Sequence, residues 1–217
     1  MLNRRAFLAG LGVATFACSS GSALAQATTH RVISAWGDSL TRGSGASPGG
    51  GYPEQIAAVT GRSIENHGIG GQTGAEILAR MRAAEGLPDR MVVIWAGRND
   101  VNGGNVEAII SNIAEMVGLT DGEHYLVLSL TNGKSEPRGT PHYQTIAAAN
   151  SRLAETYGDR FVDVRSELVS VPDLSDTAAS EQDYIPGLLR ADDIHFNDIG
   201  YQIVADAVLT RLDAFGW

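Results

Sequence analysis

The sequence predicts an α/β protein in which a parallel β-sheet is covered by helices on both faces. Two observations support this class: short apolar runs are typical of buried strands, and helical patterns alternate with them along the chain. Runs of this kind are expected in parallel sheets because both faces of each strand are buried. The expected strands cover residues 31–36, 63–67, 91–95, 125–130 and 161–163.

Three segments between or after these strands have clear helix patterns. Residues 106–117 place apolar side chains at helical spacing, and Gly118 follows directly. A second helix is expected to begin at Thr140-Pro141, an N-cap followed by proline in the first turn, and to end at Gly158. The third follows Asn197 and continues close to the end of the chain.

Two connections are longer than α/β loops usually are. Residues 43–51 are rich in glycine and follow the segment that contains Ser39, and residues 165–191 are long and acidic. Loops of this length in a compact domain usually shape a site, and disorder is the alternative. The sequence contains no internal repeat and no linker, so residues 26–217 are expected to form a single domain.

Residues 1–25 resemble a secretory signal. Arg4-Arg5 precedes an apolar stretch, and small residues leading to Ala25 form a cleavage site. The paired arginines favour the twin-arginine route, although Asn3 stands where Ser or Thr is usual. A membrane anchor is disfavoured because the apolar run is shorter than the ~20 residues that span a bilayer. Lipidation at Cys18 is a second alternative. We expect cleavage after Ala25 and a periplasmic or secreted protein.

The charge and cysteine content restrict the possible partners. The expected mature chain has 14 basic and 25 acidic residues, a formal net charge of −11. This charge argues against nucleic acid and anionic membrane surfaces as partners, and no stable membrane insertion is expected after signal cleavage. Cys18 is the only cysteine and lies in the signal, so we expect no disulfide, thiolate metal site or cysteine nucleophile.

Three unusual segments follow the first three predicted strands. Gly37–Leu40 reads Gly-Asp-Ser-Leu, residues 66–73 are rich in glycine, and residues 97–100 read Gly-Arg-Asn-Asp. Ligands of open parallel sheets bind beyond the carboxyl ends of the strands, where the strand order reverses. In the common order 2-1-3-4-5, Ser39 would lie between the glycine-rich loop and Asn99. A serine at a strand-to-loop junction is well placed to act as a nucleophile.

A fourth segment, Asp192-Asp-Ile-His195, precedes the last helix. A histidine three residues after an aspartate can turn towards a serine while the carboxylate holds the imidazole ring in the required tautomer. This spacing alone is a weak signal, and it gains weight from the other three segments.

Together, the four segments resemble the conserved blocks of the SGNH hydrolases, also called GDSL esterases or lipases. They occur in the order of that family, and the resemblance covers nearly all of the expected mature chain. It implies a three-layer, flavodoxin-like fold with a five-stranded parallel sheet of order 2-1-3-4-5. It also implies hydrolysis of acyl esters, and we expect no cofactor and no metal ion.

The resemblance also implies a role for individual residues. Ser39 would be the nucleophile, His195 the general base, and Asp192 the carboxylate that orients the histidine. The backbone N–H groups of Ser39 and Gly71, together with the side-chain amide of Asn99, would form the oxyanion hole. Each fixed donor to a tetrahedral oxyanion contributes about 3 kcal/mol.

Several of these assignments have alternatives. Asn99 could instead cap the following helix, and Gly71 could be only a turn glycine. Asp193 could replace Asp192 as the orienting carboxylate, and His67 is the other histidine worth testing as a base. A nicotinamide-binding turn at Gly68–Gly74 is disfavoured because no acidic residue ends the next strand. A metal site at residues 192–195 is disfavoured because no further ligand cluster appears.

The substrate is expected to be a small-molecule or polysaccharide ester. A small, acidic, exported hydrolase favours removal of acetyl or other short acyl groups from polar or carbohydrate substrates. The alternatives are a lysophospholipase or thioesterase, an acyltransferase with the same site, and a glycan-binding protein without turnover. We expect Asp38 and Arg98 to contribute to substrate binding. For Arg98, the alternative is a salt bridge with an acidic neighbour such as Asp100.

Overall fold

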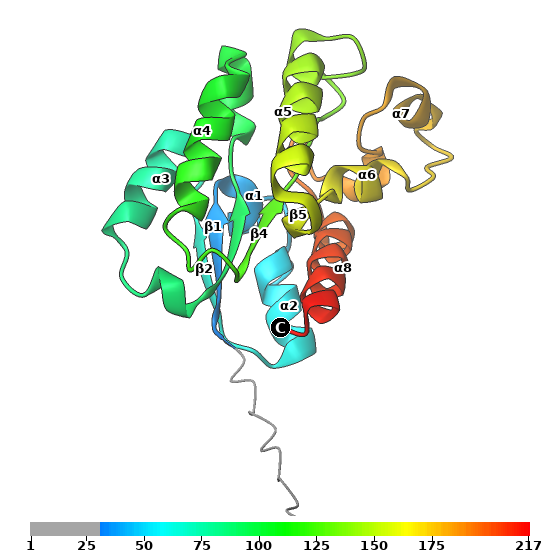
Figure 1. Ribbon diagram of the computed structural model, residues 1–217. Coiled ribbons are helices and arrows are strands. Elements are labelled where there is room, and N and C mark those ends of the chain that lie inside the picture. The colour runs from blue at the N-terminus through cyan, green and yellow to red at the C-terminus, as the bar shows by residue number, and fades with distance from the viewer. Residues whose placement is uncertain (1–30) are drawn as a thin grey trace, which may run out of the picture.

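The computed structural model describes residues 31–217 and contains the predicted five-stranded sheet (Figure 1). All neighbouring strands pair in parallel, in the order β2-β1-β3-β4-β5. The predicted fold class and strand order are therefore confirmed. The predicted signal, residues 1–25, lies outside the described residues. The strands are β1 (Ile33–Gly37), β2 (Ile64–Gly68), β3 (Met91–Trp95), β4 (Tyr125–Leu128) and β5 (Phe161–Val162).

The three predicted helices are present as α4, α5 and α8, while shorter helices fill the connections. Proline in its first turn and a threonine N-cap start α5, as the sequence indicated. Asn197 accepts two backbone N–H groups at the start of α8. The helices are α1 (Ser39–Arg42), α2 (Tyr52–Thr60), α3 (Gly74–Ala83), α4 (Val106–Val117), α5 (Pro141–Tyr157), α6 (Val164–Val169), α7 (Thr177–Gln182) and α8 (Asp198–Phe215).

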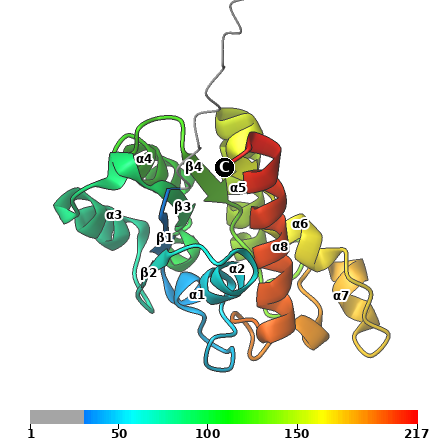
Figure 2. The ribbon, with the colours of Figure 1, turned by 90° about the horizontal axis from the view of Figure 1, so that it is seen from below.

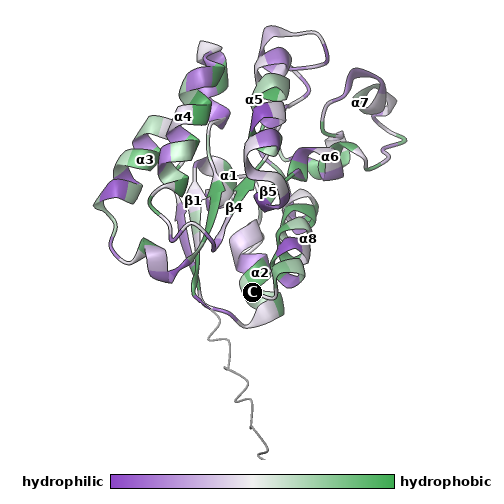
Figure 3. Ribbon diagram, viewed as in Figure 1, coloured by the Kyte–Doolittle hydropathy of each residue, from purple (hydrophilic) through white to green (hydrophobic). Residues whose placement is uncertain are grey.

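The sheet lies between two layers of helices, which explains the unbroken apolar run of β3. Val92 and Ile94 pack towards α3, α4 and α5, whereas Met91, Val93 and Trp95 pack towards α2 and α8. Figure 2 shows α2 beside α8 on one side of the sheet and α3 with α4 on the other. In Figure 3, hydrophobic residues run through strands such as β4, while hydrophilic ones appear along the outer helices.

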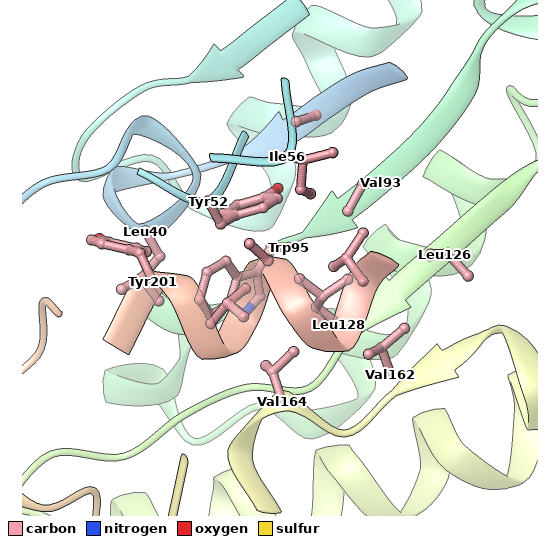
Figure 4. Packing of buried hydrophobic residues seen from close by; sticks show 14 of the residues in the cluster. Leu40, Tyr52, Ile56, Val93, Trp95, Leu126, Leu128, Val162, Val164 and Tyr201 are labelled. Carbon is pink, nitrogen blue, oxygen red and sulfur yellow. The ribbon is translucent and has the colours of Figure 1, made fainter. Parts of the chain in front are cut away.

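Trp95 is the centre of the core under the site (Figure 4). Its ring meets that of Tyr52 edge-on at 5.6 Å and stacks on Phe196 at 6.1 Å. Its indole N–H donates to the Ser129 carbonyl at 2.9 Å, so the buried polar group is satisfied. Because Phe196 follows His195, this packing fixes the chain next to the predicted base.

Both long connections are ordered by specific contacts. Residues 165–191 contain most of α6, all of α7 and a short 3₁₀ turn, so the alternative of disorder is wrong. Arg165, at the start of this segment, forms an ion pair at 3.0 Å with Asp183, which follows α7. In the glycine-rich connection, Ser47 donates to Asp198 at the start of α8 through its backbone N–H, at 2.7 Å. Residues 43–51 are therefore tied to the start of α8, close to His195.

Within residues 31–217, no helix has both the length and the apolar character that crossing a bilayer requires. The carboxyl ends of β1, β2 and β3 meet at one edge of the sheet, because the strands are parallel and adjacent. The segments that follow these three strands contain the predicted site residues.

Candidate active site

Ser39 is the first residue of α1 and is separated from the end of β1 by Asp38 alone. Asp38 caps this helix, since its Oδ1 accepts the backbone N–H of Leu40 at 2.9 Å. Gly37 is required by close packing: a Cβ there would lie 2.4 Å from the Trp95 carbonyl and 2.1 Å from the Thr41 hydroxyl. The Gly-Asp-Ser-Leu sequence thus builds a tight turn whose serine is partly exposed at the edge of the sheet.

Ser39, His195 and Asp192 form a continuous hydrogen-bonded chain. The serine Oγ lies 2.8 Å from His195 Nε2, and His195 Nδ1 lies 2.8 Å from Asp192 Oδ2. The other carboxylate oxygen, Oδ1, accepts the backbone N–H groups of Ile194 and His195 at 2.8 and 2.7 Å. Partial burial raises the pKa of Asp192, but these hydrogen bonds outweigh that effect and hold it below its ordinary value.

The segment around His195 is shaped by contacts on both sides. Its carbonyl accepts the backbone N–H of Ala191 at 2.9 Å, which closes a short turn. Gly45, with φ of +93°, lies in the connection of residues 43–51 and packs against the segment around His195. A Cβ at this glycine would lie 2.6 Å from the Phe196 carbonyl and 3.0 Å from the Cβ of His195. The loop can therefore approach His195 only because position 45 is glycine.

Asp193 points away from the imidazole ring, which separates the two adjacent carboxylates. Its oxygens accept the backbone N–H of Ser135 at 3.0 Å and the hydroxyl of the same serine. Arg190 lies 3.8 Å from it. The structure therefore brings Asp192, and not Asp193, into contact with His195.

Gly71 lies in the loop after β2, with φ of +80°. A Cβ at Gly71 would meet no atom of the described residues within 4 Å, so this stretch of backbone borders open space. The neighbouring Gly70 faces the nucleophile turn: the position of its missing Cβ is 3.8 Å from the Cβ of Ser39. Gly70, in the loop after β2, thus lies beside Ser39, as the sequence predicted.

Asn99 lies in a 3₁₀ turn, Arg98–Gly103, that follows β3. Its side-chain amide donates to the Gln72 carbonyl at 2.9 Å and, more weakly, to Asp38 at 3.4 Å. It does not cap α4, because Asn105 does so by accepting the backbone N–H of Ala108 at 3.0 Å. The cap alternative for Asn99 is therefore wrong. Its amide instead joins the segments that follow β1, β2 and β3.

The predicted substrate contacts of Asp38 and Arg98 are wrong. Asp38 is 1% exposed, and this burial raises its pKa to about 6 despite the hydrogen bond from Leu40. Arg98 is 6% exposed and forms an ion pair with Glu136 at 2.7 Å. Its partner is thus Glu136, from the connection after β4, rather than its neighbour Asp100. Neither side chain is accessible to a substrate.

Arg80 of α3 is a supporting residue that the sequence did not indicate. Its guanidinium donates to the Gln72 side chain at 2.7 Å and to the His67 carbonyl at 2.9 Å, and it lies over the Trp36 ring. It therefore anchors both ends of the loop after β2. His67, the alternative base, stacks on Trp36 at 4.1 Å and pairs with Glu65, so its partners belong to the sheet. The histidine that contacts Ser39 is His195.

Among residues 31–217, no group of three or more His, Cys, Asp or Glu side chains is arranged to hold a metal ion. Asp192 and Asp193, which would have contributed to such a site, are directed to different partners.

The family-level comparison agrees with this arrangement. Residues 35–203 match the model of the GDSL-like lipase/acylhydrolase family. The chain therefore belongs to this family, the SGNH hydrolases, and membership supports ester hydrolysis as its general activity. A search of curated proteins gave no match.

Several solved structures share the fold at low sequence identity. A lipolytic protein of the G-D-S-L family from Veillonella parvula is 21% identical, with a TM-score of 0.65 over 82% of this chain and 96% of its own. A GDSL-like lipase from Bacteroides thetaiotaomicron is 21% identical (TM-score 0.64; 85% and 89% covered). A lipase/acylhydrolase from Enterococcus faecalis is 20% identical (TM-score 0.64; 85% and 96% covered).

Proposed function

We propose that this protein is a serine esterase that hydrolyses carboxylic esters through an acyl-enzyme. The observation that carries the proposal is the hydrogen-bonded chain from Ser39 through His195 to Asp192, with 2.8 Å at each step. His195 takes the proton of the Ser39 hydroxyl as the oxygen attacks the ester carbonyl, and then gives it to the leaving alcohol. Water, activated by the same imidazole, releases the acid and restores the serine.

Asp192 favours this proton transfer because it accepts from His195 Nδ1, which leaves Nε2 free to accept the serine proton. Its carboxylate also stabilises the imidazolium that forms in the transition state. The negative charge that develops on the carbonyl oxygen requires donors held in place before the reaction. We assign this role to the backbone N–H groups of Ser39 and Gly71 and to the side-chain amide of Asn99.

We propose short acyl groups, acetyl in particular, on polar or carbohydrate alcohols as the substrates. In support, Gly70 of the loop after β2 lies beside Ser39, and the polar side chain of Asn99 donates to Asp38, the residue before Ser39. We also propose that the protein acts outside the cytoplasm, on the basis of the signal-like sequence of residues 1–25.

The test of the proposed function is hydrolysis of 4-nitrophenyl esters of graded acyl length by the purified chain. We expect the highest kcat/KM with acetate or propionate and a steep decrease towards decanoate. Acetylated oligosaccharides, assayed by acetate release, test the alcohol portion in the same experiment. A maximum at long acyl chains would contradict the preference for short acyl groups, whereas no hydrolysis of any ester would contradict the esterase itself.

The proposed oxyanion role of Asn99 predicts a kinetic defect. Asn99→Ala should lower kcat by roughly 10²–10³-fold, the usual effect of losing one oxyanion donor. KM should change little, because this hydrogen bond strengthens only as charge develops on the oxygen. Initial-rate kinetics measure both constants, and a melting curve of the variant reports its stability. Because Asn99 also donates to Gln72, a purely structural role would lower the melting temperature and leave kcat of the folded fraction near wild type.

A further inference from the structure

Arg42 occupies an unusual place among the basic residues of the protein. Residues 31–217 contain 14 arginine and lysine side chains, and all but Arg42 and Lys134 donate a hydrogen bond to another group or form an ion pair with one. Arg42 is exposed, in a protein with 25 carboxylate side chains. A guanidinium that has no partner within residues 31–217 has its full set of donors available for an external anion.

This free guanidinium lies at the edge of the proposed site. Arg42 follows Ser39 by one turn of α1. The position of the missing Cβ of Gly70 lies 3.5 Å from Nη1 of Arg42 and 3.8 Å from the Cβ of Ser39. The guanidinium and the serine therefore lie on the same side of Gly70. A group attached to an ester bound at Ser39 would be within reach of Arg42.

The charge of the rest of the molecule makes this position significant. With 25 acidic and 14 basic side chains, residues 31–217 have a formal net charge of −11, which disfavours the approach of an anion. The guanidinium of Arg42, which is unpaired among residues 31–217, offsets this field locally. A guanidinium also binds carboxylates through two parallel hydrogen bonds, so it provides orientation as well as charge.

We propose that Arg42 selects esters that carry an anionic group, such as a carboxylate, near the ester bond. This inference rests on the proposed esterase function and names the class of substrate for the same site. The sequence predicted a substrate contact for Arg98, but that side chain is buried against Glu136. Arg42 is a specificity-determining residue, because its guanidinium binds the part of the substrate that does not react.

The test compares matched pairs of charged and neutral esters. In the first pair, 4-acetoxybenzoate and 4-acetoxybenzamide, the charge is on the alcohol portion. In the second, the 4-nitrophenyl esters of adipic acid and of its terminal monoamide, the charge is on the acyl portion. The measured quantity is the ratio of kcat/KM for the anionic ester to that for its neutral partner. The pair with the larger ratio identifies the portion that faces Arg42.

We expect the wild-type protein to prefer the anionic member of at least one pair by about fivefold, and Arg42→Gln to remove this preference. The change should be mainly in KM, because the contact is the same in the ground state and the transition state. Arg42→Lys should keep part of the preference, since it retains the charge without the planar donors. Raising NaCl to ~0.5 M should weaken the wild-type preference by screening.

Arg211→Gln is the matched control, because it removes the same charge from α8, where Arg211 pairs with Asp159 at 3.6 Å. This variant should keep the wild-type ratio for both pairs. The inference is overturned if wild type shows no preference in either pair, or if Arg42→Gln leaves the ratio unchanged. If wild type hydrolyses none of these four esters but does hydrolyse 4-nitrophenyl acetate, the inference is overturned as well. If it hydrolyses no ester at all, the proposed esterase function itself fails.

Discussion

Replacing Ser39 with alanine should reduce ester hydrolysis by roughly 10⁶-fold, to the level of background. The proposed nucleophile is its hydroxyl oxygen, which is the only hydrogen-bond partner of His195 Nε2 among residues 31–217. The same variant should no longer be labelled by a fluorophosphonate, whereas mass spectrometry of labelled wild-type protein should place the adduct on Ser39. Stability should change little, because within the described chain the serine Oγ makes only the hydrogen bond to His195.

Ser44→Ala is the control for this experiment. Ser44 follows the end of α1, and its backbone carbonyl, which accepts the Tyr201 hydroxyl at 2.7 Å, is unchanged by the substitution. Its activity and labelling should match those of wild type. Undiminished turnover by Ser39→Ala, after exclusion of contaminating esterases, would refute the proposed mechanism. Lost turnover accompanied by a large drop in melting temperature would instead indicate misfolding.

The adjacent carboxylates at 192 and 193 should respond very differently to the change to asparagine. Asp192→Asn replaces the acceptor of His195 Nδ1 with an amide that cannot stabilise the imidazolium, a change that costs up to roughly 10⁴-fold in kcat in triads of this kind. Because the Asp192 side chain is 57% exposed, water screens part of the effect, and we expect roughly 10³-fold. The measurement is kcat over a range of pH at saturating ester.

Asp193→Asn provides the matched comparison, with the same chemical change one residue away. Its side chain contacts Ser135 rather than the imidazole, so we expect a decrease in kcat of less than about fivefold. A larger loss from Asp193→Asn than from Asp192→Asn would mean that the orienting carboxylate has been assigned to the wrong residue. Equal, small losses would mean that neither carboxylate takes part in proton transfer.

The inner strands of the sheet, β1, β3 and β4, were predictable because each is buried on both faces. A short, unbroken apolar run such as Met91–Trp95 predicts a buried strand of a parallel sheet when helix patterns flank it. The strand expected at 125–130 ends at Leu128 in the structure. The prediction extended too far because the chain stays buried through Leu130 after strand pairing stops. The helix α2 was not predicted, because it starts at Tyr52 directly after a glycine-rich stretch that suggests only a loop. The helices α6 and α7 have six residues each, too few to show a helical period.

The candidate site was predictable where its residues belong to short local motifs. Ser39 and the Asp192–His195 pair were identified in this way, and the structure brings them together. The sequence could not show which partner each side chain takes across the fold. Glu136 is 38 positions from Arg98, and Ser135 is 58 from Asp193. Such contacts depend on how the connections after β3 and β4 pack, which no local pattern encodes.

The burial of Asp38 links the site to the overall stability of the protein. Its pKa is about 6 in the folded chain, compared with 3.8 for an ordinary aspartate. The folded state therefore holds this proton more tightly than the unfolded state does. The resulting contribution to folding is complete below pH 3.8 and is lost as the pH rises through 6. The ionised carboxylate thus makes the fold less stable at neutral pH than a neutral residue of the same shape would, by on the order of 3 kcal/mol.

Asparagine at position 38 would not carry a buried charge. Its amide would, however, place N–H groups where the backbone N–H of Leu40 and the side-chain amide of Asn99 both donate to Asp38. A carboxylate is the side chain that can accept both. The protein therefore gives up folding free energy at Asp38 in return for a fixed geometry next to Ser39. This is the kind of compromise between stability and activity that functional sites commonly contain.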